Sequence, residues 1–309
     1  MELKLNGINI SVLGGDNREL VLIPQLIKLG AKVKAVGFPS SLHQLAGAEI
    51  INSIDDALEE TDVVILPMPG TDQLGNIRAI YSEEKLVLTE KHLKQLQKGT
   101  PIIMGVAKDF LKQWAIKHQL KLIEIAEQDE VAILNAIPTA EGTIKILMEQ
   151  SPITIHNSKS IVLGLGRVGF TVARTLAALG SKVMVVVRKE ADKARGFELG
   201  YQVCTYETLP DNLTDANFII NTVPAKVINR ELLTSMPHDS LIVDLATQPG
   251  GTDFQAAEEI GINAMLAPGL PGKVAPKTAG EILARVIPKI IKQHLKTKGA
   301  GGACDGFER

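Results

Sequence analysis

Short apolar runs alternate with segments of helical periodicity along the first half of the chain. Runs that are apolar throughout are typical of strands in a parallel sheet covered on both faces by helices. The pattern predicts a doubly wound α/β domain of flavodoxin-like type over residues 1–150. Its predicted strands cover residues 8–13, 32–37, 62–66, 101–104 and 121–125. Its predicted helices cover residues 18–29 and 110–118, and a helix over 139–150 is expected to lead into the second half.

A second set of apolar runs begins after the polar, irregular segment 151–158. These strands, separated by helical stretches, predict a Rossmann dinucleotide-binding domain over residues 151–276, so the expected fold class is α/β with two doubly wound parallel-sheet domains. An amphipathic helix over 277–295 is expected to pack back onto the first domain, and residues 298–309, without a core pattern, are expected to be a flexible tail. The second set of predicted strands covers residues 160–163, 182–187, 202–204, 218–221, 241–245 and 263–266.

The second domain opens with a glycine fingerprint, GLGRVG, between an apolar strand and a helix. Gly164 permits a tight turn, Gly166 lets the backbone approach a pyrophosphate, and Gly169 lets the helix pack closely on the strand. Arg167 and Val168 begin the helix, whose free N–H groups would face the phosphates. A glycine-rich turn without a ligand is the alternative, but the strand–turn–helix context favours a dinucleotide site.

The tip of the next strand bears on the choice of cofactor. NAD-binding domains usually place an acid there, whereas this chain has Arg188 and Lys189 before the first acid, Glu190. Two cations suit a ribose 2′-phosphate, so we expect NADP, with NAD as one alternative and a solvated basic loop without a ligand as another.

The ends of the fourth and fifth strands of this domain are also expected to border the cofactor, because ligands of doubly wound sheets lie outside the carboxyl ends of the strands. A turn before a helix is the alternative for the first segment, and Asp244 is expected to anchor a loop. The predicted cofactor contacts at these ends are Asn221, Thr222, Val223, Pro224 and Leu245.

Composition excludes several functional classes. The net charge of −2 gives no basis for nucleic-acid binding, and the chain has no run of 18 apolar residues and no pattern of a secretory signal. Two cysteines and six scattered histidines form no motif for a disulfide framework or a metal site. We therefore expect a cytoplasmic protein without a metal, a nucleic-acid partner or a membrane partner.

Longer segments carry a more specific signal: VLGGDNREL (12–20), AIPTAEGTI (136–144), VLGLGRVGFTVARTLAALG (162–180), INTVP (220–224), DLATQPGGTDF (244–254) and APGLPGKVAPKTAG (267–280). Together they resemble the family of dipicolinate synthase A subunits of sporulating bacteria, over about residues 6–293. Only the glycine fingerprint is shared widely among dehydrogenases. The resemblance therefore depends on AIPTAEGTI, QPGGTDF and APGLPGKVAPKTAG.

The resemblance implies an NAD(P)-dependent oxidoreductase that acts on a CH–CH or ring C–H donor. Its substrate would be dihydrodipicolinate or the hydrated precursor, on a branch of the lysine pathway, and its product dipicolinate. The family also implies a flavoprotein-like B subunit of dipicolinate synthase as partner, action during sporulation and the mother-cell cytoplasm as location. We further expect a homo-oligomer.

A small dicarboxylate substrate requires cations, backbone N–H groups or helix N-termini. Asn17 and Arg18 follow a glycine turn at a helix start, where they are candidates for binding a carboxylate, although a surface arginine fits the same pattern. Pro67, after the third strand, is a candidate wall of the substrate site or a plain turn.

Two further segments contribute candidates. Glu141 is the predicted proton acceptor, or a residue that stabilises a first helical turn, with Glu127 and Asp129 as alternative acceptors. Thr139 and Thr143 beside Glu141 are candidate substrate contacts. Lys273, in a glycine–proline loop similar to those near the nicotinamide in methylenetetrahydrofolate and alanine dehydrogenases, is predicted to bind a substrate carboxylate. Gly272 and Thr278 are candidate substrate contacts in the same segment, with helix capping as the alternative for Thr278.

Two other functions remain open at this point. One is a different two-domain NAD(P)-dependent dehydrogenase of a small acid, although the Glu–His pair common in hydroxyacid dehydrogenases has no convincing counterpart here. The other is a nucleotide-binding scaffold that recruits or regulates a partner enzyme. A scaffold would bind the cofactor without turnover.

The cofactor prediction is tested by Arg188→Asp. Loss of a charge-assisted contact to the 2′-phosphate should weaken NADP binding at least about tenfold and spare or improve NAD binding. Fluorescence titration with both reduced cofactors measures this, and an unchanged preference would show that Arg188 does not read the 2′-phosphate.

Overall fold

The computed structural model describes residues 3–296. The chain forms two compact units: unit 1 runs up to Val131 and resumes at Pro276, and unit 2 comprises Ala132–Ala275. Each unit is built on a six-stranded sheet whose strands are all parallel. The predicted fold class, two doubly wound α/β domains, is confirmed. The predicted tail, residues 298–309, lies outside the described residues.

The sheet of unit 1 has the strand order β3-β2-β1-β4-β7-β8. The five predicted strands follow the expected flavodoxin-like order, but a sixth strand, β3, extends the sheet at its edge. The sequence pattern missed the edge strand β3, which has only three residues and is half-buried. With β3 present, three strands lie on each side of the switch between β1 and β4, as in a Rossmann sheet. The strands are β1 (Asn9–Leu13), β2 (Lys32–Val36), β3 (Glu49–Ile51), β4 (Val63–Ile65), β7 (Pro101–Met104) and β8 (Lys121–Glu124).

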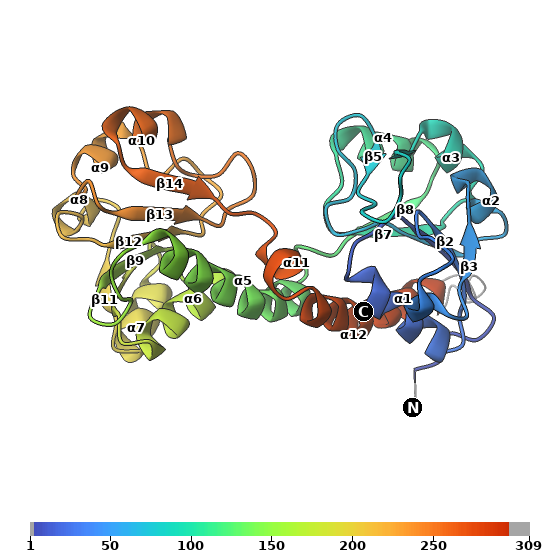
Figure 1. Ribbon diagram of the computed structural model, residues 1–309, viewed down its shortest axis with the longest axis horizontal. Coiled ribbons are helices and arrows are strands. Elements are labelled where there is room, and N and C mark those ends of the chain that lie inside the picture. The colour runs from blue at the N-terminus through green and yellow to red at the C-terminus, as the bar shows by residue number, and fades with distance from the viewer. Residues whose placement is uncertain (1–2, 297–309) are drawn as a thin grey trace, which may run out of the picture. The chain divides into compact units, whose positions relative to one another are not determined.

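Helices cover both faces of this sheet (Figure 1). One face carries α1 (Glu19–Lys28), the 3-10 turn η1 (His43–Leu45) and α12 (Pro276–Lys296), whose apolar side packs against α1 and the sheet. The other face carries α2 (Ile54–Leu58), α3 (Glu90–Lys94) and α4 (Asp109–Lys117). A short antiparallel hairpin, β5 (Asn76–Ile77) and β6 (Leu86–Val87), follows β4 in the chain.

Unit 2 has the strand order β11-β10-β9-β12-β13-β14, the order of a Rossmann domain. The register alternates side chains between two cores: Val162 faces one helical layer, and its neighbours Ile161 and Leu163 face the other. The strands are β9 (Lys159–Leu163), β10 (Lys182–Val186), β11 (Gln202–Cys204), β12 (Phe218–Asn221), β13 (Leu241–Asp244) and β14 (Asn263–Leu266).

The helices of unit 2 form two layers (Figure 1). One layer contains α6 (Arg167–Ala178), α7 (Glu190–Glu198), α11 (Leu270–Val274) and the unit 2 part of α5 (Asp129–Gln150). The other contains α8 (Leu209–Asn212), α9 (Arg230–Thr234) and α10 (Phe254–Ile260).

Helix α5 corrects two expectations. It begins ten residues before the predicted start at Thr139, because the apolar segment 131–134 is helical and Pro138 is accommodated inside the helix. The division between the units consequently falls between Val131 and Ala132 and not at residue 150.

By length and composition α5 is also the one described helix that would suffice to cross a membrane. However, Ala140 and Leu147 are fully buried in the core of unit 2, as expected for a core helix.

Candidate functional site

The glycine turn after β9 has the geometry that a dinucleotide-binding loop needs. Gly164 has φ of +89°, and its N–H donates to the carbonyl of Val186 at 2.9 Å. A Cβ on Gly169 would lie 2.1 Å from the Gly164 carbonyl oxygen, so only glycine allows α6 to start this close to the strand. By contrast, a Cβ on Gly166 would meet no protein atom within 4 Å. The turn is thus tight on its inner side and open at Gly166, where the fingerprint predicts a pyrophosphate.

The predicted cofactor residues around this turn lie at the carboxyl edge of the sheet. Arg167 and Val168 form the first turn of α6, with Gly166 as its N-cap. Arg188 and Lys189 follow β10 and are exposed, and within residues 3–296 neither side chain makes an ion pair. The tip of β10 is therefore cationic and available to an anionic group.

A buried carboxylate organises the ends of β12 and β13. Asp244 is fully buried and accepts hydrogen bonds from Asn221 Nδ2, the amides of Ala246 and Gly251, and Thr252 Oγ1, at 2.7 to 3.0 Å. Four neutral donors satisfy the charge of the carboxylate. As a result, the loop after β13 is tied to the end of β12, and Asp244 holds a loop as expected.

The segment after β12 is fixed by side chain to main chain hydrogen bonds. Asn221 accepts from the Val223 amide at 3.0 Å, and Thr222 Oγ1 donates to the Leu163 carbonyl at 2.7 Å, beside the glycine turn. Pro224 is exposed, and the Leu245 amide donates to the Asn221 carbonyl at 2.8 Å. The predicted cofactor contacts from β12 and β13 are thus brought together beside Gly164.

The two predicted catalytic residues lie on neighbouring helices of unit 2. Glu141 is exposed in the middle of α5, so it does not begin a helix as expected. The next residue, Gly142, packs against Leu270 of α11, because a Cβ there would lie 3.1 Å from the Leu270 Cβ. Lys273 is exposed one turn further along α11. The expected loop at residues 271–275 is thus largely a helix, and it also contains Gly272.

Two of the three predicted threonine contacts donate hydrogen bonds to carbonyls of their own helix. Thr139 and Thr143 donate to the carbonyls of Asn135 and Thr139, at 2.7 and 2.9 Å, and Thr143 is fully buried. Thr278 is exposed in the first turn of α12, two residues after its first residue, Pro276, so capping at the start of the helix is not its role.

The carboxyl edge of the unit 1 sheet holds a buried charged cluster. Arg18 donates through Nε and Nη2 to the two carboxylate oxygens of Asp16, at 2.9 and 2.8 Å, and the Asp16 amide donates to Glu19 Oε2 at 2.6 Å. Burial raises the pKa of Asp16, but hydrogen bonds and charge from Arg18, with the charge of Arg78, outweigh it and hold the pKa below its usual value.

Glu19 is the unusual acid of this cluster. The residue is 1% exposed, and burial raises its pKa to about 7, against the lowering effects of the Asp16 amide and the Arg18 charge. A carboxyl with this pKa changes protonation near neutral pH. The sequence does not single out Glu19, because only its burial distinguishes it from an ordinary acid in a first helical turn.

Arg78 is a second residue that the sequence did not indicate. It precedes no recognisable motif, yet its Nε lies 3.2 Å from Asp16 Oδ2, and its side chain is 52% exposed. The predicted contact Asn17 is exposed and accepts a hydrogen bond from the Tyr81 hydroxyl. Pro67 is buried after β4, and its carbonyl accepts from the Gly70 amide at 2.7 Å, as in a plain turn.

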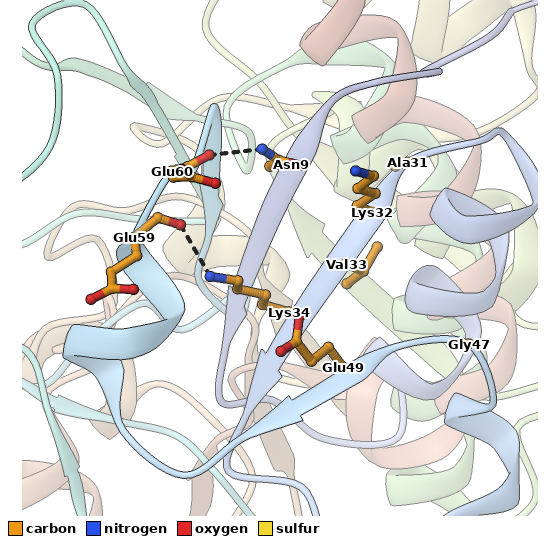
Figure 2. A pocket seen from close by; sticks show the side chains of 9 residues that line it. All are labelled: Asn9, Ala31, Lys32, Val33, Lys34, Gly47, Glu49, Glu59 and Glu60. Carbon is orange, nitrogen blue, oxygen red and sulfur yellow. Dashed lines mark hydrogen bonds between the residues drawn. The ribbon is translucent and has the colours of Figure 1, made fainter.

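An open depression of about 430 Å³ lies at the opposite edge of the same sheet (Figure 2). It is lined by the first residues of β1, β2 and β3, with Lys34 donating to the Glu59 carbonyl at 3.1 Å. Ligands of doubly wound sheets lie at the carboxyl ends of strands, so this depression is not a candidate site. Residues 3–296 contain no group of three acidic, histidine or cysteine side chains suited to a metal ion.

Comparison with known proteins finds a family match for each half of the chain. The family described as the N-terminal domain of the A subunit of dipicolinate synthase matches residues 9–126, and the C-terminal domain of alanine dehydrogenase/PNT matches residues 132–305. The dipicolinate synthase A subunit of Bacillus subtilis strain 168 is 42% identical, over 96% of this chain and 99% of that protein.

Solved structures give the same result. The dipicolinate synthase A subunit from Bacillus halodurans superposes with a TM-score of 0.90 at 40% identity, over 93% of this chain and 99% of that one. A transhydrogenase from Sinorhizobium meliloti shares the fold alone, with a TM-score of 0.68 at 16% identity over 93% of this chain and 94% of that one.

The open side of the glycine turn is tested by Gly166→Val. The backbone at Gly166 suits any residue and its Cβ meets no protein atom, so the variant should fold normally. The side chain would occupy the space beside the turn and reduce the affinity for a nicotinamide dinucleotide by at least about 100-fold, through loss of two or more hydrogen bonds to phosphate.

Titration of NADPH fluorescence and a thermal melt measure the two effects. Gly169→Ala is the contrasting variant, because its Cβ would clash with the Gly164 carbonyl and should lower the melting temperature itself. A valine variant that binds NADPH as tightly as the wild type would remove the phosphate site from this turn.

The buried carboxyl of Glu19 predicts a pH-dependent stability. The folded protein keeps the Glu19 proton up to about pH 7, whereas the unfolded chain releases it near the ordinary glutamate pKa of 4.5. The free energy of unfolding should therefore fall as the pH rises from about 4.5 through about 7, by up to about 3 kcal/mol.

Glu19→Gln cannot ionise and retains an oxygen acceptor for the Asp16 amide, so it should lose this slope. Urea unfolding at several pH values compares it with the wild type and with the exposed control Glu83→Gln, which should keep the slope. Parallel pH profiles for Glu19→Gln and the wild type would contradict the assignment.

Proposed function

Because the chain belongs to the family of dipicolinate synthase A subunits, we propose that it is an oxidoreductase that oxidises dihydrodipicolinate, or the hydrated precursor, to dipicolinate. A nicotinamide dinucleotide would accept the hydride when bound. The observation that carries the proposal is the glycine turn of unit 2, which is closed around Gly164 and Gly169 and open at Gly166.

In this proposal the carboxyl edge of the unit 2 sheet binds the cofactor. The main chain of the Gly164–Gly169 turn and the first turn of α6 hold the pyrophosphate through N–H groups. Asn221, Thr222 and the loop tied down by Asp244 border the nicotinamide half. Arg188 and Lys189 support NADP over NAD, because exposed cations at this strand tip match a 2′-phosphate.

We propose that Glu141 accepts the proton released in the oxidation and that Lys273 binds one substrate carboxylate. Oxidation of the dihydropyridine ring removes a hydride and a proton, so a base must be available as the ring becomes aromatic. Both side chains are exposed, and their helices pack together at Gly142 and Leu270. The Lys273 ammonium would hold a carboxylate while the Glu141 carboxylate takes the proton.

The family also suggests partners and a location. Its members are subunits of a dipicolinate synthase, so the chain is expected to work with a second, different subunit. We propose a flavoprotein-like B subunit for this role, with a homo-oligomer as the form of the present chain. The cytoplasm of the mother cell during sporulation is the proposed location.

The proposed reaction is tested with the purified chain, alone and with the B subunit, given NADP and freshly prepared dihydrodipicolinate. NADPH and dipicolinate should appear in equal amounts. Glu141→Gln should lower kcat about 100-fold, the scale of a lost general base, without changing the affinity for NADPH. Glu149→Gln, an exposed acid of the same helix, is the matched control and should leave kcat unchanged.

Two outcomes would contradict the proposal. Cofactor binding without turnover, whether or not the B subunit is present, would instead indicate a nucleotide-binding scaffold. No detectable binding of either NADPH or NADH would remove the oxidoreductase assignment altogether.

A further inference from the structure

The switch point of the unit 1 sheet lies between β1 and β4, where the strand order reverses. Strands β2 and β3 lie on one side of this point, and β7 and β8 lie on the other side. In doubly wound sheets this is where ligands bind, outside the carboxyl ends of the strands. The segment around Arg78, just before the turn of the β5–β6 hairpin, lies beside this point, because Gly15, two residues after β1, pairs with Ala79 in a parallel bridge. The arginine side chains that meet here are those of Arg18 and Arg78.

Arg18 is already committed. Its Nε and Nη2 face both oxygens of Asp16, at 2.9 and 2.8 Å, and its side chain is 10% exposed. This bidentate pairing occupies one of the two edges through which a guanidinium can hold a carboxylate, and burial leaves little of the rest accessible. Arg18 therefore serves as the internal partner of Asp16.

Arg78 differs in how much of its guanidinium is used. Only Nε contacts Asp16, at 3.2 Å, and the side chain is 52% exposed. Among the residues that the structure describes, neither terminal nitrogen of Arg78 has a hydrogen-bond partner. Two donor nitrogens of a planar fork are thus available at the edge of the sheet.

The main chain holds Arg78 in place. The Gly15 amide donates to the Arg78 carbonyl at 2.8 Å, and the Ile80 amide donates to the Gly15 carbonyl at 3.1 Å. A Cβ on Gly14 would lie 2.7 Å from the Arg78 carbonyl oxygen, so the two segments pack without a side chain between them. Arg78 is therefore oriented before any ligand arrives, which lowers the entropy cost of binding.

The charge of the cluster favours an anion. Arg18 and Arg78 carry two positive charges against one negative charge on Asp16, whose pKa is lowered so that it stays ionised. Glu19 adds a full negative charge only above about pH 7. Below that pH the two arginines and the two acids together carry a net positive charge. The solvent-exposed part of this charge is the end of the Arg78 side chain.

We propose that Arg78 is the carboxylate-binding residue of unit 1, whose two terminal nitrogens receive one carboxylate of a small dicarboxylate while Asp16 holds the guanidinium in position. Arg18, the residue that the sequence favoured, supports Asp16 and does not contact the ligand. The inference rests on the proposed function, from which it takes dipicolinate as the ligand.

The test is calorimetric titration of dipicolinate into the full chain saturated with NADP. Arg78→Met should weaken dipicolinate binding by about 10- to 100-fold, and Arg78→Lys, which keeps the charge but loses the fork, should weaken it less. Arg285→Met is the matched control, because it also removes one exposed arginine and one ion pair, with Glu130, from unit 1. It should bind dipicolinate like the wild type, and all variants should keep the wild-type affinity for NADPH.

A second measurement uses the wild-type protein and so does not depend on how the variants fold. In protein labelled with ¹⁵N-arginine, the Nε resonance of Arg78, assigned by its absence in Arg78→Lys, should shift during the dipicolinate titration. The Nε resonance of Arg285 should not shift.

The outcomes separate this inference from the function on which it rests. If the wild type binds dipicolinate and Arg78→Met binds it equally well, or the Arg78 resonance does not move, the inference is overturned and the proposed function stands. An equal loss in Arg285→Met would also overturn it, by showing a general effect of charge. If the wild type binds NADP but not dipicolinate, both are overturned.

Discussion

Both units depend on the same turn of the main chain at the end of the first strand of the sheet. In unit 1 the amide of Gly14, with φ of +67°, donates to the carbonyl of Val36 at 2.9 Å. In unit 2 the amide of Gly164, with φ of +89°, donates to the carbonyl of Val186 at 2.9 Å. This hydrogen bond extends the parallel ladder by one residue and then turns the chain into a helix, which only a residue that tolerates positive φ can do cheaply. The residues after each turn therefore lie at the carboxyl edge of their sheet, together with the loops that follow the other strands.

The side chains near each turn differ between the units, and the difference gives each edge its chemistry. In unit 2 the buried carboxylate of Asp244 is satisfied by neutral donors, which lets it brace a loop without attracting another charge. In unit 1 the buried carboxylate of Asp16 is satisfied by two arginines, so cationic groups gather there. The first arrangement leaves no unpaired charge beside the glycine turn, whereas in the second the exposed end of Arg78 keeps the edge cationic.

The sequence predicted the features that local patterns determine. Apolar runs identified most strands of both sheets, and the spacing of Gly164, Gly166 and Gly169 identified the turn, since each glycine acts on its near neighbours in the chain. Helix α5 was misjudged at its start, because the sequence pattern did not mark the apolar segment 131–134 as helical, and Pro138 is accommodated inside the helix. At the start of α10 the cap is Asp253, whose side chain accepts from the Ala256 amide, while the neighbouring Thr252 donates to Asp244.

Long-range pairing explains the rest of the gap between sequence and structure. Arg78 and Asp16 are 62 residues apart, and their contact depends on how a short hairpin docks beside the β1 loop. No periodicity in the segment GNIRAI, residues 75–80, predicts this contact. The raised pKa of Glu19 likewise depends on burial under neighbouring segments, a property that one position in a sequence does not carry.

The return of α12 to unit 1 has a consequence for how the polypeptide acquires its structure during synthesis. Unit 2 is continuous in the chain, so its whole core is available once residue 275 has left the ribosome. Unit 1 lacks Leu283, Val286, Ile287, Ile290 and Ile291 of its core until the final helix emerges. One apolar face of the amino-terminal sheet therefore stays partly uncovered until the whole of unit 2 has been synthesised. This order is the reverse of the usual one, in which domains fold from the amino terminus onward.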